Sequence, residues 1–280
     1  MGEALEIPNV SAAIRLHTDE TGGGLIASPP PSLSNAPLRG DPERGTPFGG
    51  YMAAAALRTA RQQLAVDLPL RTLTIQFMAG ARFAPVTFRA ERLRGGRSTT
   101  FAAVRADQGE RAILSSLLTF GDSGRGPEHR PLNDPFPPVE SLPGDVLEGP
   151  IAPWFTRAVQ YRFDGEAGVM GGQTDSVVRV WMRVRDPGPL DELKLAFLLD
   201  AVFPNFFRVS GPTFATSVDL RYDFFQAMTP DLSPDGWAFF EFRTADASDG
   251  WAVEDGVAYA PDGRPLAVAR QLRKVLAQRG

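Results

Sequence analysis

The chain has 280 residues, of which 43% are apolar and 22% charged, a balance typical of a globular protein with one large domain or two of ordinary size. A net charge of −4 argues against nucleic acid as a partner, and the lack of cysteine excludes disulfides, thiolate nucleophiles and thiolate-bound metals. Only two histidines occur, His17 and His129, which argues against a histidine metal site or a serine–histidine–aspartate triad, so we expect neither a metal nor a cofactor.

The N-terminal segment predicts no targeting signal. Residues 1–10 contain two glutamates and no apolar run, unlike a signal peptide. No segment approaches the roughly 18 to 20 apolar residues that a membrane-spanning helix needs. We therefore expect a cytoplasmic protein with no membrane partner. Residues 1 to about 46 are rich in glycine, proline and serine, and predict a short strand or two followed by loop.

The next segment predicts a helix followed by strands. Gly49 and Gly50 precede an alanine-rich stretch in which apolar residues recur at helical spacing, which predicts a helix over residues 51–64. After it, apolar and polar residues alternate in segments separated by glycine-containing turns, which is typical of strands. The predicted strands are residues 72–77, 86–93, 99–106 and 112–120. The first half is thus predicted to be one helix followed by an antiparallel meander.

The middle of the chain differs in composition. Prolines recur among glycines and acidic residues from residue 121 to 153, and such a stretch forms neither a strand ladder nor a helix interior. It therefore predicts a linker. The expected organisation is an N-terminal unit of residues 1–120, a linker of residues 121–153 and a C-terminal unit of residues 154–280.

The second half repeats the plan of the first. A helix is predicted over residues 190–203, ended by Pro204. Each half has one helix, then a strand that ends in an aromatic residue (Phe77 or Phe224), then three more strands. Two such copies predict a duplicated α+β unit. The predicted strands are residues 158–163, 177–184, 214–225, 237–244, 253–260 and 266–276.

Several common catalytic motifs do not occur in the sequence. It has no Gly-x-Ser-x-Gly, no phosphate-binding Gly-x-x-x-x-Gly-Lys and no Gly-x-Gly-x-x-Gly after a strand. It also lacks His-Glu-x-x-His. These absences argue against a serine hydrolase of the nucleophile-elbow type, an NTPase, a dehydrogenase and a zinc protease.

One carboxylate stands out in the second predicted helix. The run from Leu195 to Phe203 is apolar almost all round and should be buried. Asp200 is its only charged residue. A buried carboxylate must find hydrogen-bond donors or shift its pKa, and such groups gather at functional sites. The alternative is a structural aspartate that accepts a hydrogen bond from a loop amide.

Two polar residues on predicted strands fit the same picture. Alternate apolar residues form one face of the strand that contains Ser217 and leave Ser217 on the other face. Gln271 shares a face with Ala267 and Ala269, whose small side chains let a helix approach closely. A hydroxyl and a carboxamide together can hold a water molecule beside a carboxylate. Taken singly, each residue would be interpreted as a solvated strand position.

Four segments, in this order, carry a resemblance to a known family: Phe48-Gly49-Gly50-Tyr51, Leu198-Leu199-Asp200-Ala201, Thr216-Ser217-Val218-Asp219-Leu220, and the stretch from Asp262 to Gln271. Together they resemble the type II acyl-CoA thioesterases, over residues from about 45 to 276 without the linker. The resemblance implies a double hot-dog fold, with two fused units that each wrap an antiparallel sheet around a long helix.

In that family an aspartate, a threonine or serine, and a glutamine activate the hydrolytic water. The resemblance assigns these roles to Asp200, Ser217 and Gln271 as catalytic residues. Serine at 217, in place of the commoner threonine, keeps the hydroxyl but loses the methyl that restricts its rotamer. Thr216 is adjacent, and a shift of one residue in register would exchange the two.

The start of the first helix is also predicted to belong to the site. Backbone N–H groups around Gly50 and Tyr51 could stabilise a developing oxyanion, and glycine at positions 49 and 50 would let the substrate approach closely. A tight turn before a helix is the alternative. The predicted substrate-binding residues are Phe48, Gly49, Gly50, Tyr51 and Thr216. The thioester itself is expected in a tunnel where the two units meet.

The predicted function is hydrolysis of an acyl-CoA or another pantetheine thioester. One alternative is a biosynthetic enzyme of the same fold that dehydrates, cyclises or offloads a carrier-bound polyketide or fatty acyl chain. Another is a non-catalytic acyl-CoA-binding protein. The expected partner is accordingly an acyl-CoA or acyl-carrier thioester. Unpaired sheet edges, together with the resemblance, imply a homo-oligomer.

Overall fold

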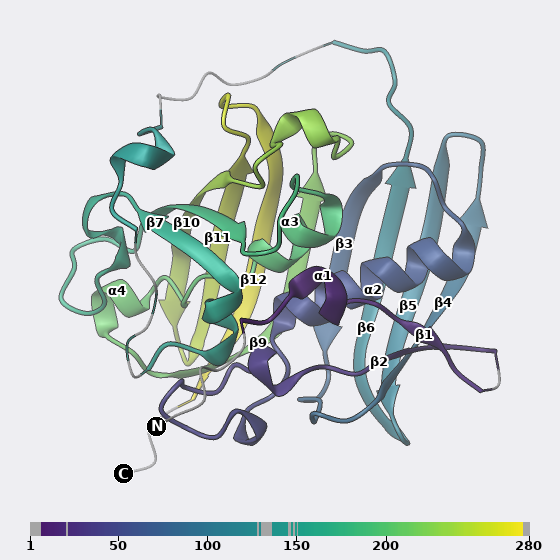
Figure 1. Cartoon of the computed structure of the whole chain (residues 1–280), viewed down its shortest axis with the longest axis horizontal. Helices are drawn as coiled ribbons and strands as arrows, with labels where there is room; N and C mark the ends of the chain where they lie inside the picture. Colours follow the sequence, from purple (N-terminus) through teal and green to yellow (C-terminus); the bar gives the residue numbers. More distant parts are fainter. Residues whose placement is uncertain are drawn as a thin grey trace.

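The computed structural model describes residues 7–20, 22–127, 129, 136–144, 147, 149 and 151–276. Within them, the strands form one antiparallel sheet in the order β1-β2-β4-β5-β6-β3-β9-β12-β11-β10-β8-β7 (Figure 1). The first half contains α1 (Val10–Ala13), β1 (His17–Thr18), β2 (Leu25–Ala27), α2 (Gly49–Leu64), β3 (Leu70–Phe77), β4 (Val86–Gly95), β5 (Thr99–Gln108) and β6 (Arg111–Gly121). The second contains β7 (Val159–Phe163), β8 (Val178–Val184), α3 (Glu192–Leu198), α4 (Phe207–Ser210), β9 (Phe214–Phe224), β10 (Ala238–Ser248), β11 (Trp251–Tyr259) and β12 (Pro265–Leu276).

The sheet has a duplicated plan, which confirms the predicted double hot-dog fold. β3 and β9 pair with each other at the centre, where Leu73 lies opposite Tyr222. Outward from this pair, β6-β5-β4-β2 on one side corresponds to β12-β11-β10-β8 on the other. The helices α2 and α3 contact each other and lie across one face of the sheet (Figure 1).

The predicted meander of the first half is wrong in one respect. β4, β5 and β6 do form a meander, but β3 pairs with β6 and with β9 rather than with β4. Both edges of β3 are thus occupied, one by its own half and one by the other half. The alternation of apolar residues predicts that a segment is a strand but carries no information on its neighbours.

The second predicted helix is too long. α3 begins after Asp191, whose side chain accepts hydrogen bonds from the N–H groups of Leu193 and Lys194, and it ends at Leu198. The apolar run continues, but the N–H of Ala201 donates to the carbonyl of Leu198, three residues back, in a tighter turn than that of an α-helix. The Ala201 carbonyl accepts a hydrogen bond of 2.7 Å from the Tyr161 hydroxyl. Asp200 therefore lies in the turn that follows α3.

The helix α2 packs closely because of its composition. Its alanines at positions 53–56 are completely buried. Small side chains allow the helix to lie close to the sheet and to α3, at the packing density of a protein core. The helix ends at Leu64 because Ala65 takes the left-handed conformation with φ of 48°.

None of the helices in the described part of the chain has the length and apolarity that a bilayer crossing requires. Residues 1–6 and several positions of the predicted linker, residues 121–153, lie outside the described residues. The boundaries of the two predicted units therefore stay a prediction.

Candidate active site

Asp200 is buried, and its carboxylate faces the first turn of α2. Asp200 is only 7% exposed. The backbone N–H of Gly50 donates a hydrogen bond to this carboxylate. A Cβ atom on Gly49 would lie 2.5 Å from Asp200 Oδ2, so only glycine leaves room for the carboxylate. Since Phe48 provides no side-chain cap for α2, Asp200 supplies the negative charge that the N-terminal end of a helix favours.

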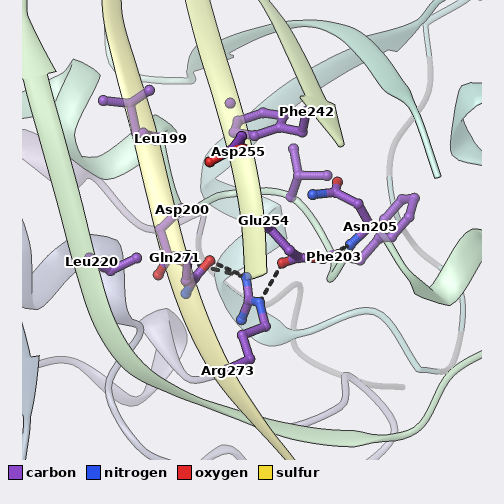
Figure 2. A pocket seen from close by; sticks show the side chains of 13 residues that line it. Leu199, Asp200, Phe203, Asn205, Leu220, Phe242, Glu254, Asp255, Gln271 and Arg273 are labelled. Carbon is purple, nitrogen blue, oxygen red and sulfur yellow. Dashed lines mark hydrogen bonds and ion pairs between the residues drawn. The ribbon is translucent and has the colours of Figure 1, made fainter. Parts of the chain in front are cut away.

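Gln271 joins Asp200 to Ser217. Its Nε2 atom donates to Asp200 Oδ1 over 3.0 Å and to Ser217 Oγ over 2.6 Å. Figure 2 shows Gln271 beside Asp200, with Arg273 next along the same strand. The structure thus brings together the aspartate, hydroxyl and carboxamide that were predicted to meet.

A β-bulge brings Ser217 to this cluster. Leu272 of β12 pairs with Asp219 and Arg273 pairs with Ser217, so Val218 is an extra residue on β9. A bulge interrupts strict alternation. Ser217 therefore points to the same face as the buried side chains of β9, and its predicted place on the opposite face is wrong.

Thr216 lies away from the cluster. It is exposed and pairs with Lys274 on β12. Successive side chains of a strand point to opposite faces, so Thr216 points away from Asp200 while Ser217 points toward it. The predicted substrate contact of Thr216 with this site is therefore not supported by the geometry.

The other residues at the start of α2 fill the core. Phe48 stacks on Phe155 with ring centroids 3.8 Å apart and meets Phe197 edge-on at 4.9 Å. The hydroxyl of Tyr51 donates to the Ala13 carbonyl over 3.3 Å, and burial raises the pKa of Tyr51 well above its ordinary value. The N–H of Gly50, predicted to bind an oxyanion, is instead bound to Asp200.

Two charged residues that the sequence interpretation missed complete the cluster. Arg273 Nε donates to Glu254 Oε2 over 2.6 Å, and the Arg273 guanidinium also donates to Gln271 Oε1. Glu254 in turn accepts hydrogen bonds from the backbone N–H groups of Asn205 and Phe206. Glu254 is 4% exposed and Arg273 is 8% exposed. Strand alternation carried a signal, since Arg273 is two residues from Gln271 and therefore on the same face. Glu254 shares its face of β11 with the small residues Ala252 and Gly256.

Burial sets the protonation of Asp200. Removal of the carboxylate from water raises the pKa of Asp200 to about 6, although Arg273 and the hydrogen bonds from Gln271 and Gly50 act in the opposite direction. The negative charge of Glu254 adds to the increase. A carboxylate with a pKa near neutrality is suited to general base catalysis because it both accepts and releases a proton readily.

A small cavity lies next to Asp200 and is shown in Figure 2. Its volume of about 20 Å³ has room for about one water molecule and not for an acyl chain. The cavity therefore does not test the predicted thioester tunnel between the two units, which stays a prediction. The lining residues include Asp200, Asn205, Leu220, Glu254, Gln271 and Arg273.

The hydroxyl of Tyr222 is a buried polar group near Asp200 whose contribution to stability can be tested. It is completely buried on β9, and its hydroxyl has no hydrogen-bond partner among the described residues. An unpaired buried hydroxyl costs about 1–3 kcal/mol. Tyr222→Phe is therefore expected to leave the free energy of unfolding unchanged or to raise it by about 1 kcal/mol, as measured in urea.

Tyr161→Phe is the matched control, because the Tyr161 hydroxyl is also buried but donates to the Ala201 carbonyl. Its loss should lower the free energy of unfolding by about 1–2 kcal/mol. Equal destabilisation by the two substitutions would contradict the description of Tyr222 as unpaired.

Comparison with known proteins identifies relatives of both halves. Residues 38–121 match the family model described as the acyl-CoA thioesterase N-terminal domain, and residues 127–273 match that of the acyl-CoA thioesterase C-terminal domain. A comparison with curated protein sequences finds no significant match.

Solved structures share the fold over almost the whole chain. A conserved protein of unknown function with a hot-dog fold from Alicyclobacillus acidocaldarius is 24% identical, with a TM-score of 0.84 and coverage of 96% of this chain and 98% of that one. The acyl-CoA thioesterase II TesB2 from Mycobacterium marinum is 21% identical, with a TM-score of 0.72 and coverage of 97% and 98%. The tesB protein of Mycobacterium avium subspecies paratuberculosis is 17% identical, with a TM-score of 0.75 and coverage of 97% and 100%.

Proposed function

The chain belongs to the acyl-CoA thioesterase family and is a thioester hydrolase, and we propose that Asp200 activates the hydrolytic water with the help of Ser217 and Gln271. The observation that carries this proposal is the buried carboxylate of Asp200, with its pKa raised to about 6, hydrogen-bonded to the amide nitrogen of Gln271. The same amide nitrogen also donates to Ser217.

In the proposed reaction Asp200 acts as a general base. Its carboxylate accepts a proton from water as the water oxygen attacks the thioester carbonyl carbon and the carbonyl π electrons move to the oxygen. When the tetrahedral intermediate collapses, the carbon–sulfur bond breaks and the proton on Asp200 passes to the departing sulfur. The products are a carboxylic acid and a free thiol, and no covalent acyl-enzyme is needed.

Ser217 is proposed to act as a donor. Its Oγ accepts hydrogen bonds from Gln271 Nε2 over 2.6 Å and from Arg273 Nη1 over 3.3 Å. A hydroxyl has two acceptor positions and one proton, so both acceptor positions are occupied. The proton of Ser217 is therefore free to donate to the water oxygen or to the thioester carbonyl oxygen. The positive end of the α2 helix dipole adds favourable potential for the developing oxyanion.

This role of Asp200 predicts the pH dependence of hydrolysis. The carboxylate must be ionised to accept a proton, so kcat/KM should be constant above about pH 7 and fall about tenfold per pH unit well below pH 6. The measurement is kcat/KM for one acyl-CoA at a series of pH values, with hydrolysis monitored as the loss of thioester absorbance. A kcat/KM that does not change between about pH 5 and pH 8 would contradict the proposal.

A panel of acyl-CoA esters tests the substrate. Release of free CoA, detected with a thiol reagent, supports hydrolysis of CoA esters. Binding without release would favour the non-catalytic alternative, and activity on a carrier-bound acyl chain alone would favour the biosynthetic one. The predicted homo-oligomer stays a prediction, and the mass of the particle in solution tests it.

A further inference from the structure

The carboxamide of Gln271 is useful to Asp200 in only one of its two orientations. In the structure, the amide nitrogen donates to Asp200 Oδ1 and to Ser217 Oγ, while the amide oxygen Oε1 points to Arg273. The reversed amide would place its oxygen, an acceptor, against the carboxylate, which is also an acceptor. Ser217 does not fix the orientation, because a hydroxyl can donate or accept, and Asp200 selects it only while its carboxylate is ionised, since a protonated carboxyl can donate to the amide oxygen.

Arg273 can only donate hydrogen bonds. A guanidinium has five N–H donors and no acceptor, so the atom of Gln271 that meets it must be the oxygen. The amide nitrogen is then directed to Asp200. On these contacts, and given the function proposed above, we infer that Arg273 is a positioning residue that holds the Gln271 carboxamide with its nitrogen toward Asp200.

Arg273 is itself held in place. Glu254 Oε2 accepts from Arg273 Nε over 2.6 Å, and the other oxygen of Glu254 accepts from backbone N–H groups of Asn205 and Phe206. Glu254 thus links Arg273 to the chain just before α4. All of these contacts are buried, so water does not compete for them. An arginine with a buried carboxylate partner loses little freedom when it orients Gln271.

The charges around Asp200 should change the pH profile of the reaction when they are removed. Arg273 Nη2 lies 3.8 Å from Asp200 Oδ1 and lowers the pKa of Asp200, whereas Glu254 raises it. The other facing groups are Tyr222 of β9, whose burial keeps it protonated, and Asp255 of β11, which pairs with Arg270 over 3.1 Å. α2 contributes the uncharged N–H of Gly50. Removal of Arg273 and removal of Glu254 should therefore shift the pH profile in opposite directions.

The experiment compares Arg273→Met, Glu254→Gln and the double variant R273M/E254Q with the unmodified chain. Loss of Arg273 should lower kcat roughly 10- to 100-fold with KM changed less than about threefold, because a misplaced group slows the reaction more than it weakens binding. The acid limb of kcat/KM should move to higher pH in R273M and to lower pH in E254Q. In the double variant the limb should return toward its original position while kcat stays low.

The double variant also guards against misfolding. R273M alone leaves the buried carboxylate of Glu254 without its partner, which destabilises the fold, whereas removal of both charges is far better tolerated. Arg221→Met is the matched control, since Arg221 is on the neighbouring strand β9 with its side chain exposed and paired with Asp223, and neither residue lines the cavity beside Asp200. Its kcat and its pH profile should be unchanged.

A purely structural role for Arg273 predicts different results. Activity would then fall only in proportion to the fraction of unfolded protein, with the acid limb unmoved in both single variants, and this would overturn the inference. An active Asp200→Asn variant would instead overturn the proposed function itself. If Asp200→Asn is inactive and R273M/E254Q keeps full kcat, only the role of Arg273 is wrong.

Discussion

Asp200→Asn is expected to lower kcat about 1,000-fold while the protein still folds. Asparagine cannot accept the proton of the attacking water, and a general base contributes a factor of about 100 to 10,000 to the rate. Its amide oxygen can still accept the hydrogen bond from Gln271, so the local structure keeps most of its contacts. The measurement is kcat for an acyl-CoA at about pH 8, where Asp200 of the unmodified chain is ionised.

The same substitution should change how the free energy of unfolding depends on pH. Since the pKa of Asp200 is raised from 3.8 to about 6 by folding, the folded state holds the proton to higher pH than the unfolded state does. That contribution to stability is complete below the unfolded pKa and is lost as the pH rises through about 6. Asparagine has no proton to lose there, so its stability relative to the unmodified chain should increase between about pH 4 and pH 7.

Asp223→Asn is the control for both measurements. Asp223 lies on β9, is partly exposed and pairs with Arg221 over 2.9 Å, so its loss should leave kcat unchanged. If Asp200→Asn kept more than about a tenth of the original kcat, Asp200 would not be the general base. Such a result would leave the family and the fold in place and remove only the mechanism.

Much of the fold could be predicted because its signals are local. The alternation of apolar residues identified the strands, and the repeat of helix and strands identified the duplication. What failed depended on pairing between distant segments. β3 was given the wrong neighbour because its partner β9 is about 150 residues away, as the pairing of Leu73 with Tyr222 shows. The end of α3 was missed because the apolar run continues past Leu198, and the sequence has no helix-breaking residue before Pro204.

The candidate site likewise has one residue with a local sequence signal and others that depend on contacts between distant segments. Asp200 could be found from the sequence because a single charge in an apolar run is visible without any knowledge of the fold. Its hydrogen bond to Gln271 and the link to Ser217 were implied by resemblance and not by the residues alone. The bulge at Val218, which turns Ser217 toward Gln271, exists only in the pairing of β9 with β12.

Arg273 and Glu254 were missed for a further physical reason. Charged residues on strands are usually solvated, so their burial is not predicted by residue type. The two become tolerable in the interior only because they pair with each other and with backbone N–H groups. A buried ion pair is thus a property of two strands together, here β11 and β12.

Gly49→Ala is expected to lower activity without lowering the stability of α2. An added Cβ would lie 2.5 Å from Asp200 Oδ2, so the carboxylate must move and its alignment with Gln271 is lost. A displacement of about 1 Å in a catalytic group costs roughly 100-fold in rate, and we expect kcat to fall by about that factor. Alanine is the better helix former, so the stability of α2 itself should not suffer. Release of free CoA and unfolding in urea measure the two effects.

Gly50→Ala provides the contrast, because its Cβ would collide with the backbone oxygen of Phe197, which cannot move aside as a carboxylate can. That substitution should lower the free energy of unfolding by about 1–3 kcal/mol. If Gly49 acts only through Asp200, the double variant of Gly49→Ala and Asp200→Asn should be no slower than Asp200→Asn alone, since the two changes remove the same interaction. A further loss of rate in the double variant would mean that position 49 also contacts the substrate directly. The space beside Gly49 would then be needed by the substrate as well as by the carboxylate of Asp200.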